Sequence, residues 1–411
     1  MVRLKLSVDN ILKMSVLARD QASEFPRRRD LFYRLEKVFL RGRGRFVGIV
    51  GPRGVGKTVI LKQILKDFGG IYISFDGYDI GSTDVFLDIL LRIRKRFGVR
   101  LFLFDEVHYY PDFSSLVRML YGFTDIRAIF TSSVAVVFSQ LRQDLSRLVR
   151  LEYLYPFDFK EFLLFNYDID VPYISFGELI EREKVDEIYW GVGRYFEEYL
   201  RGGVYPFSME MGEITDVMRN VLERIVWEDV GRVISLELRE IHEIEDMISF
   251  IGKSEVDGIS YSSISRNVGL TKYKVRQYIK ALEKAFVLNV VLPYGTNVKR
   301  EPKILMAPSY RLLYRGYEEA KGGLREDFAV QMLKQKGFDF YYLKGTKGEK
   351  RPDFLVRYGN KKVVIEVGGR GKGYKQFKGL SDDYYKVVLK DGWDGMVGSL
   401  PLFIIGCVGE Q

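Results

Sequence analysis

Residues 46–58 read Phe46-Val-Gly-Ile-Val-Gly-Pro-Arg-Gly-Val-Gly-Lys-Thr58. The first five residues suit a buried parallel strand, and the last eight match the pattern G-x-x-x-x-G-K-T in full. Glycines in such a loop permit close approaches that a Cβ would obstruct, so that consecutive N–H groups can surround a phosphate. After the loop, Ile60, Leu61, Ile64 and Leu65 have the spacing of a helix docked on a sheet. This stretch therefore predicts an α/β domain with a strand, a phosphate-binding loop and a helix in succession.

The loop also carries side chains suited to ATP and Mg²⁺. Lys57 can supply positive charge to the β- and γ-phosphates, and the Thr58 hydroxyl can bind Mg²⁺. A glycine-rich turn without function is the alternative, but an intact pattern between a strand and a helix disfavours it. We expect ATP and Mg²⁺ as cofactors and ADP as the product of hydrolysis. The predicted nucleotide-binding residues are Gly51, Pro52, Arg53, Gly54, Val55, Gly56, Lys57, Thr58 and Val59.

A second apolar strand, Leu101-Phe-Leu-Phe104, ends in the acidic pair Asp105-Glu106. Parallel sheets present their ligand-binding edge at the carboxyl ends of the strands. We expect Asp105 to hold the Mg²⁺ shell and Glu106 to orient and activate the attacking water. A simple helix cap is the alternative explanation of the two acidic residues, but it does not account for the order strand, Asp, Glu.

A third strand is predicted to end in polar residues at the same edge. Ala128-Ile-Phe130 leads into Thr131-Ser132-Ser133. Thr131 and Ser132 are candidate sensors that hydrogen-bond the γ-phosphate or the attacking water, and ordinary helix capping is an equal alternative. Ile71–Phe75 is expected to form another strand and Thr83–Phe97 an amphipathic helix.

The order of these elements resembles AAA+-type ATPases, in particular the archaeal P-loop ATPase family with winged-helix and nuclease-like C-terminal parts. Further markers of the resemblance are Phe25–Asp30, Tyr155–Phe162 and Gly202-Gly203 with Pro206, which has one residue more than the family's Gly-Gly-x-Pro. The resemblance implies a homo-oligomer, for which a hexamer is one option. It also implies an arginine that completes a neighbour's site; Arg147 is the first candidate, with Arg142 and Arg150 as alternatives. Phe25 and Arg28 would lie near the adenine.

The resemblance also implies four domains. They are an AAA+-type P-loop core at residues 1–170, a helical lid at 171–235, a winged helix-turn-helix at 236–310 and a PD-(D/E)xK nuclease-like α/β domain at 311–411. A chain of 411 residues is long enough for two to four domains. The predicted fold class is therefore α/β, with a parallel sheet core followed by these three smaller parts.

Composition limits the other possibilities. One cysteine and two histidines leave no basis for a disulfide or a structural zinc site. Few Cys and His among abundant Lys, Arg and Glu is typical of a heat-adapted, thermophilic protein. The N-terminus lacks the apolar core of a signal peptide, and the apolar stretch 396–408 is too short to cross a membrane. We expect a cytoplasmic protein without a membrane partner.

The positive charge is concentrated in one segment. The chain has a formal net charge of +9, yet residues 299–378 alone hold 20 Lys and Arg against 9 Asp and Glu. A localised basic segment favours an anionic partner such as DNA, while a solvated surface is the alternative.

A helix-turn-helix pattern precedes this basic segment. Ser262–Val268 has helical spacing, Gly269 interrupts it, and Thr271 can cap a second helix. The alternating apolar run Phe286–Leu292 predicts a wing hairpin. Four cations on the outward side of the second helix suit contacts with DNA, although winged helices also serve as protein-contact modules. These cations are Lys272, Lys274, Arg276 and Lys280.

Three acidic residues near the C-terminus resemble the PD-(D/E)xK nuclease core. Glu326 lies in a predicted helix, Asp353 opens a strand and Glu366 ends one. Carboxylates on adjacent strand ends can share Mg²⁺ and activate water. The family's lysine is absent, because Val367 and Gly368 follow Glu366, and Lys372 or Arg370 would have to replace it. A domain that keeps the fold but cuts weakly or not at all is therefore favoured.

Three functions follow from these patterns. The first is a Mg²⁺-dependent, oligomeric ATPase that couples ATP binding and hydrolysis to DNA binding or remodelling. The second is a slow nucleotide-dependent switch that binds DNA or a partner protein. The third is an ATP-gated DNA nuclease.

Overall fold

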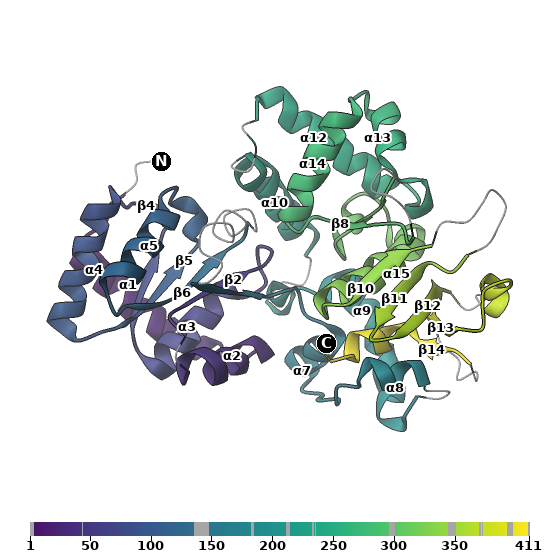
Figure 1. Cartoon of the computed structure of the whole chain (residues 1–411), viewed down its shortest axis with the longest axis horizontal. Helices are drawn as coiled ribbons and strands as arrows, with labels where there is room; N and C mark the ends of the chain where they lie inside the picture. The colour runs from purple at the N-terminus through teal and green to yellow at the C-terminus, as the bar shows by residue number, and fades with distance from the viewer. Residues whose placement is uncertain are drawn as a thin grey trace. The chain divides into compact units, whose positions relative to one another are not determined.

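The computed structural model describes residues 4–42, 44–134, 148–181, 185–210, 214–231, 234, 236–295, 301–343, 351–369, 371, 373–392 and 398–409. The chain forms two compact units, Met1–Tyr155 and Pro156–Gln411. Figure 1 shows the first unit in purple and blue, with β2, β5 and β6 side by side. The finer predicted boundaries at residues 170, 235 and 310 stay predictions.

The first unit is built on a five-stranded sheet in the order β3-β5-β6-β2-β7, in which every neighbouring pair is parallel. A parallel strand that is apolar along its length can be covered by helices on both faces. β2 is such a strand, and it is buried along its whole length. The α/β class and the parallel core predicted from the sequence are therefore confirmed. The strands are β2 Phe46–Val50, β3 Ile71–Ser74, β5 Leu101–Asp105, β6 Arg127–Ser132 and β7 Val149–Tyr153.

Helices connect these strands and pack in pairs, α1 beside α3 and α4 beside α5. A short parallel pair, β1 Leu4–Lys5 with β4 Tyr78–Asp79, is added outside the main sheet. The helix predicted over Thr83–Phe97 has these bounds in the structure. The helices are α1 Val8–Gln21, α2 Asp30–Leu35, α3 Lys57–Phe68, α4 Thr83–Phe97 and α5 Phe113–Phe123.

The second unit begins with helices. The elements named among its described residues up to Val230 are all helical, and the lid predicted for residues 171–235 stays a prediction. The α-helices are α7 Phe159–Tyr167, α8 Phe176–Glu181, α9 Phe196–Glu198 and α10 Thr215–Arg224, with 3₁₀ or π turns at Glu187–Tyr195, Tyr199–Gly203, Pro206–Met209 and Ile225–Val230.

Three helices and a hairpin follow: α12 Leu238–Lys253, α13 Tyr261–Val268, α14 Lys272–Lys284, and the antiparallel strands β8 Leu288–Val291 and β9 Lys303–Met306. Gly269 ends α13 in the left-handed conformation, and the Thr271 hydroxyl caps α14 by accepting a bond from Lys274 N. The side chains predicted to face inward from α14, Val275, Ile279 and Leu282, are buried. Two helices joined by a tight turn thus lie where the sequence predicted them.

The C-terminal part of the second unit is a five-stranded mixed sheet in the order β10-β11-β12-β13-β14. The first two pairings are antiparallel and the last two are parallel. Helix α15 Tyr317–Gln335 packs on β12, and Leu355, Val364 and Val388 form part of the core of the sheet. The strands are β10 Asp339–Tyr342, β11 Phe354–Tyr358, β12 Lys361–Gly368, β13 Tyr384–Lys390 and β14 Leu400–Pro401.

None of the helices in the described ranges is long and apolar enough to span a membrane.

Candidate nucleotide-binding site

The phosphate-binding loop joins β2 to α3 and depends on glycine at two positions. Gly56 has φ +92°, a left-handed conformation that side chains with a Cβ disfavour, and α3 begins at the next residue. A Cβ on Gly51 would lie 1.9 Å from the carbonyl oxygen of Leu154. Substituting either residue would displace the loop backbone, whose N–H groups are the predicted phosphate ligands.

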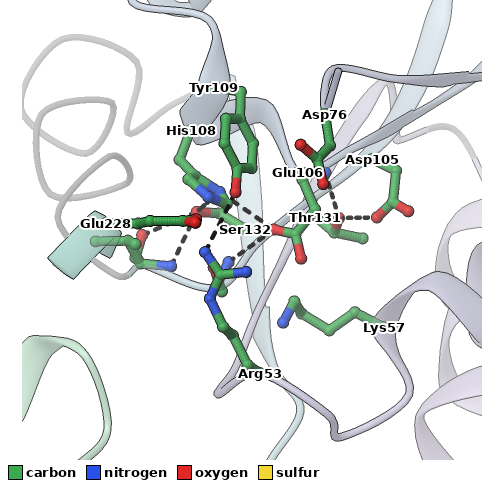
Figure 2. Close-up of polar contacts among 12 residues, drawn as sticks. Arg53, Lys57, Asp76, Asp105, Glu106, His108, Tyr109, Thr131, Ser132 and Glu228 are labelled. Carbon is green, nitrogen blue, oxygen red and sulfur yellow. Dashed lines mark hydrogen bonds and ion pairs between the residues drawn. The ribbon is translucent and has the colours of Figure 1, made fainter. Parts of the chain in front are cut away.

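Lys57 is buried in the loop, with 4% of the residue exposed. Its ammonium donates to the carbonyl oxygens of Gly51 and Pro52, each at 2.9 Å. The charge is therefore held at the loop, and it lowers the pKa of Glu106. Figure 2 shows the Lys57 ammonium and the Glu106 carboxylate on the same side of the site. The role of Lys57 at the β- and γ-phosphates stays a prediction of the sequence pattern.

Asp105 lies at the end of β5 and is almost completely buried, with 3% of the residue exposed. Its carboxylate accepts bonds from three hydroxyls: Thr58 at 2.8 Å, Tyr72 at 2.6 Å and Thr131 at 2.5 Å. Burial raises the pKa of Asp105 and the neighbouring Glu106 adds to the rise, while the three hydroxyls oppose it. The buried charge is stabilised by hydroxyl groups from three elements, α3, β3 and β6.

The pair of Thr58 and Asp105 fits Mg²⁺, because the ion prefers oxygen ligands and is usually held by one or two protein groups together with phosphates and waters. Across the part of the chain that the structure describes, no three His, Cys, Asp or Glu side chains are grouped to hold a metal ion. A Mg²⁺ ion at Thr58 and Asp105 would therefore take its remaining ligands from the nucleotide and from water.

Glu106 follows β5 in a left-handed backbone conformation, with φ 53°, which is uncommon outside glycine. Its Oε2 lies 3.1 Å from His108 Nδ1 and accepts a bond from Ser133 N at 3.3 Å. Burial alone would raise the pKa of Glu106, but the charge of Lys57 and the hydrogen bond with His108 lower it below its usual range. The side chain is therefore a carboxylate at neutral pH, as the orientation of a water molecule requires.

The two predicted sensors have different surroundings. The Thr131 hydroxyl donates to Asp105 and accepts from Glu106 N at 2.9 Å, so it joins the two acidic residues directly. The Ser132 hydroxyl forms a local turn with Val134 and lies 3.4 Å from His108 Nδ1. Thr131 thus lies at the carboxylates, and Ser132 lies behind them (Figure 2).

The arginines named in the sequence analysis, Arg53 from the phosphate-binding loop and the others from the resemblance, have different partners. Arg53 donates to the Tyr109 hydroxyl at 3.3 Å. Arg28 pairs with Asp67 at 2.5 Å. Arg150 pairs with Glu152 on the same strand. Arg147 and Arg142 lie outside the described residues.

Sequence reasoning missed three residues of this site. Tyr72 lies in the apolar strand β3, and His108 follows the acidic pair, so both residues stand beside predicted site elements. The sequence does not show which side chains they contact. Arg29 is buried and donates to the carbonyl oxygens of Val55 at 3.0 Å and Tyr155 at 2.8 Å. It ties the phosphate-binding loop to the end of the first unit.

The cations predicted for DNA contact all lie on α14. Lys272, Arg276 and Lys280 are exposed, although Lys272 lies 3.8 Å from a carboxylate oxygen of Glu301. The Arg276 guanidinium lies 5.3 Å from the centroid of the Tyr261 ring. The exposed cations share the solvent side of the helix.

Lys274 differs from these three cations. Its ammonium lies 3.4 Å from a carboxylate oxygen of Glu240 and 3.0 Å from one of Glu243, both on α12. Tyr278 donates its hydroxyl to the same two carboxylates. Lys274 therefore helps to join α14 to α12.

The nuclease-like carboxylates come from α15, β11 and β12. Asp353 directly precedes β11 and accepts a bond from Val367 N at 2.8 Å, beside the fully buried Glu366. Glu326 lies 2.5 Å from the ammonium of Lys303, a residue that the sequence analysis did not select. Burial raises the pKa of Glu326 to about 7, Asp353 adds to the rise and Lys303 opposes it. Lys372 lies outside the described residues.

Family models match two parts of the chain. The model described as "AAA domain" matches residues 43–163, and "Domain of unknown function (DUF8612)" matches residues 193–307. Comparison with curated proteins gives no match. The first match covers the phosphate-binding loop, the strand that ends at Asp105 and the strand that ends at Ser132.

Several solved structures overlap with the chain at low scores. The replication initiator DnaA, bound to AMPPCP and single-stranded DNA, has a TM-score of 0.28 at 17% identity, with 64% of this chain and 91% of that chain covered. The Thermotoga maritima RuvB Holliday junction branch migration motor has a TM-score of 0.26 at 16% identity, with 69% and 89% covered. Katanin has a TM-score of 0.25 at 16% identity, with 46% and 71% covered. Scores this low support no inference about function.

The first unit therefore joins a glycine-rich loop to a parallel sheet, and residues 43–163 match the model described as "AAA domain".

We predict that Tyr72→Phe destabilises the protein, because Asp105 loses one of three hydroxyl donors while it stays buried. The free energy of unfolding should fall by about 1–3 kcal/mol, as expected for a bond to a buried charged group. Urea denaturation measures this change. The control is Tyr33→Phe, at a residue that is 53% exposed, and it should change stability by less than about 0.5 kcal/mol. Equal stability of both variants would contradict this account of Asp105.

Proposed function

We propose that this protein is a Mg²⁺-dependent ATPase that oligomerises and couples ATP binding and hydrolysis to DNA binding. The observation that carries the proposal is a single hydrogen-bonded cluster at the carboxyl edge of the sheet. In it, Thr58, Asp105 and Thr131 are bonded directly, Glu106 is joined through Thr131, and Lys57 lies close enough to act on Glu106. Phosphoryl transfer requires such a set of a cation, metal ligands and a water-orienting carboxylate.

Each side chain has a separate task in this proposal. Lys57 and the N–H groups of the loop bind the phosphates, and Thr58 with Asp105 holds Mg²⁺, which would neutralise charge on the phosphate oxygens. Glu106, kept anionic by Lys57 and His108, orients the attacking water. Thr131 orients the Asp105 carboxylate and the backbone of Glu106, because its one hydroxyl donates to the former and accepts from the N–H of the latter.

Two substitutions separate nucleotide binding from hydrolysis. Lys57→Ala should abolish ATP binding, because the charge at the phosphates is lost. Glu106→Gln should retain ATP but release no phosphate, because the carboxylate that positions water is lost. Fluorescent-nucleotide binding and phosphate release measure the two effects. Lys66→Ala, an exposed lysine on the same helix as Lys57, is the matched control and should change neither. A normal rate of ATP hydrolysis by Glu106→Gln would show that Glu106 does not position the attacking water.

The proposal includes DNA as the partner of the second unit. Its support is the exposed cationic side of α14 and the basic segment 299–378. We assign α12, α13, α14 and the hairpin of β8 and β9 as a winged helix with α14 as its recognition helix. We assign α15 with the mixed sheet as a nuclease-like domain that contributes to DNA binding. Contacts of this kind are made mainly to phosphates, so binding should be steeply salt-dependent.

Replacing Lys272, Arg276 and Lys280 by methionine should weaken DNA binding roughly uniformly across sequences. The salt dependence should flatten by about one unit of slope for each lost phosphate contact. Lys274→Met is the matched control on the same helix and should have a smaller effect, because α12 already pairs this charge. Fluorescence anisotropy with duplex DNA between about 50 and 200 mM salt measures the slopes. A DNA affinity that does not change with salt over this range would show that the exposed cations of α14 form a solvated surface and do not contact DNA.

The proposal also includes a homo-oligomer in which Arg147 completes the site of a neighbouring subunit. Arg147→Ala subunits and Glu106→Gln subunits should each be inactive alone. Mixed together, they should recover part of the ATPase activity, because some interfaces then combine one intact half-site from each chain. Full activity of Arg147→Ala alone would exclude this residue, and Arg142 and Arg150 would be tested next.

A slow nucleotide-dependent switch is the second candidate. The observation that favours it is the pairing of Lys274 with Glu240 and Glu243, which removes one cation from the side of α14 available to DNA. In that case duplex DNA would not change the rate of ATP hydrolysis, whereas the first proposal predicts that it does.

A further inference from the structure

We propose that Lys303 is the built-in cation of the C-terminal carboxylate cluster and occupies the place of a divalent metal, so that the nuclease-like domain works without metal-dependent cleavage. This inference rests on the proposed nuclease-like assignment of α15 and the mixed sheet, and it is independent of the ATPase proposal because it concerns only side chains of the second unit.

Lys303 reaches the cluster from β9, a strand outside the mixed sheet. The residue is 9% exposed, and its ammonium lies 2.5 Å from Glu326 Oε2 and 3.0 Å from Asp257 Oδ1. It also lies 5.5 Å from the centroid of the Phe354 ring, next to Asp353 in the chain. Asp353 is near enough for its charge to act on the ammonium. One buried cation thus pairs with two carboxylates, the exposed Asp257 and the largely buried Glu326, and lies within electrostatic range of a third.

Like a bound metal ion, the Lys303 ammonium supplies positive charge that compensates the carboxylates. Buried carboxylates are costly unless a cation or hydrogen-bond donors compensate them. By resemblance, Glu326 and Asp353 would be ligands of Mg²⁺, but Glu326 already gives an oxygen to the ammonium. A divalent ion at this position would have to displace Lys303 or bear its repulsion. The fixed lysine therefore lowers the affinity of the cluster for metal ions.

The carboxylate cluster is open to solvent, so restricted access is not the reason that a metal ion would be kept out of it. A cavity of about 490 Å³ adjoins the cluster and is lined by Asp257, Glu301, Lys303, Arg351 and Asp353, among others. This volume admits hydrated ions. The competition between Lys303 and a metal ion is therefore electrostatic, and replacing the lysine by a neutral side chain of similar length should reveal it.

The test is Mn²⁺ binding to the full-length protein without nucleotide, followed by electron paramagnetic resonance of the free ion. Lys303→Met should bind one Mn²⁺ more than the wild type, since oxygen ligands of the cluster become free to bind it. The double variant Lys303→Met with Glu326→Gln should lose this additional ion. Lys378→Met, an exposed lysine of the same domain, should bind as the wild type does. Failure of a folded Lys303→Met protein to gain a site would overturn the proposal.

A second comparison decides the question even if Lys303→Met does not fold. Wild type and Glu326→Gln should give the same Mn²⁺ isotherm, because Glu326 binds no metal while Lys303 is present. Plasmid DNA incubated with the wild type and Mn²⁺ should stay intact. Loss of a Mn²⁺ site in Glu326→Gln, or nicking by the wild type that Glu326→Gln abolishes, would show that the cluster is a working metal site.

Discussion

The first unit depends on how the carboxylate of Asp105 is stabilised inside the sheet. A buried carboxylate without partners would cost several kcal/mol or take up a proton. Here three hydroxyls, from Thr58, Tyr72 and Thr131, donate to it. Each comes from a different element, so the same contacts that stabilise the charge also hold α3, β3 and β6 in register around β5. The site is therefore part of the packing of the domain.

The second unit solves the same problem with cations. Arg311, 1% exposed, donates to both carboxylate oxygens of Asp327 and to backbone carbonyls of α12 and its end, including Ser254 at 3.0 Å. Lys303 does the equivalent for Glu326 and also pairs with the exposed Asp257. Both cations follow the helical part in sequence and contact acidic residues of α15. These ion pairs connect the helical part of the second unit to its mixed sheet.

The sequence predicted the parts of the site that are local. The loop from Gly51 to Thr58 and the pair Asp105-Glu106 have fixed spacing, because one strand and one turn set their geometry. Tyr72 could not be assigned, since nothing in an apolar strand indicates which neighbour its hydroxyl will meet. Lys303 was hidden for the same reason: Asp257 lies in an earlier 3₁₀ turn and Glu326 on a later helix, and one lysine in a basic segment looks like any other. Lys274 was over-interpreted as free charge, because its acidic partners lie on α12.

The fold shows the same difference between features set by local sequence and features set by distant partners. The apolar strands were predicted within two residues of their observed bounds and the amphipathic helix Thr83–Phe97 at its observed bounds, since their patterns are periodic. The mixed sheet was anticipated only through a resemblance to the nuclease core. Its register, with Phe354 opposite Ile365, is what brings Asp353 beside Glu366, and pairing between strands is not encoded in local spacing.

The central claim is that the cluster around Asp105 and Glu106 hydrolyses ATP with Mg²⁺ and that the second unit couples this reaction to DNA. The most direct measurement is phosphate release from ATP by the wild type, with Mg²⁺ or with EDTA, in the presence and absence of duplex DNA, while a gel follows the DNA. We predict release that requires Mg²⁺ and changes in rate when DNA is added, with the DNA left intact. Absence of Mg²⁺-dependent release under all these conditions would contradict the account.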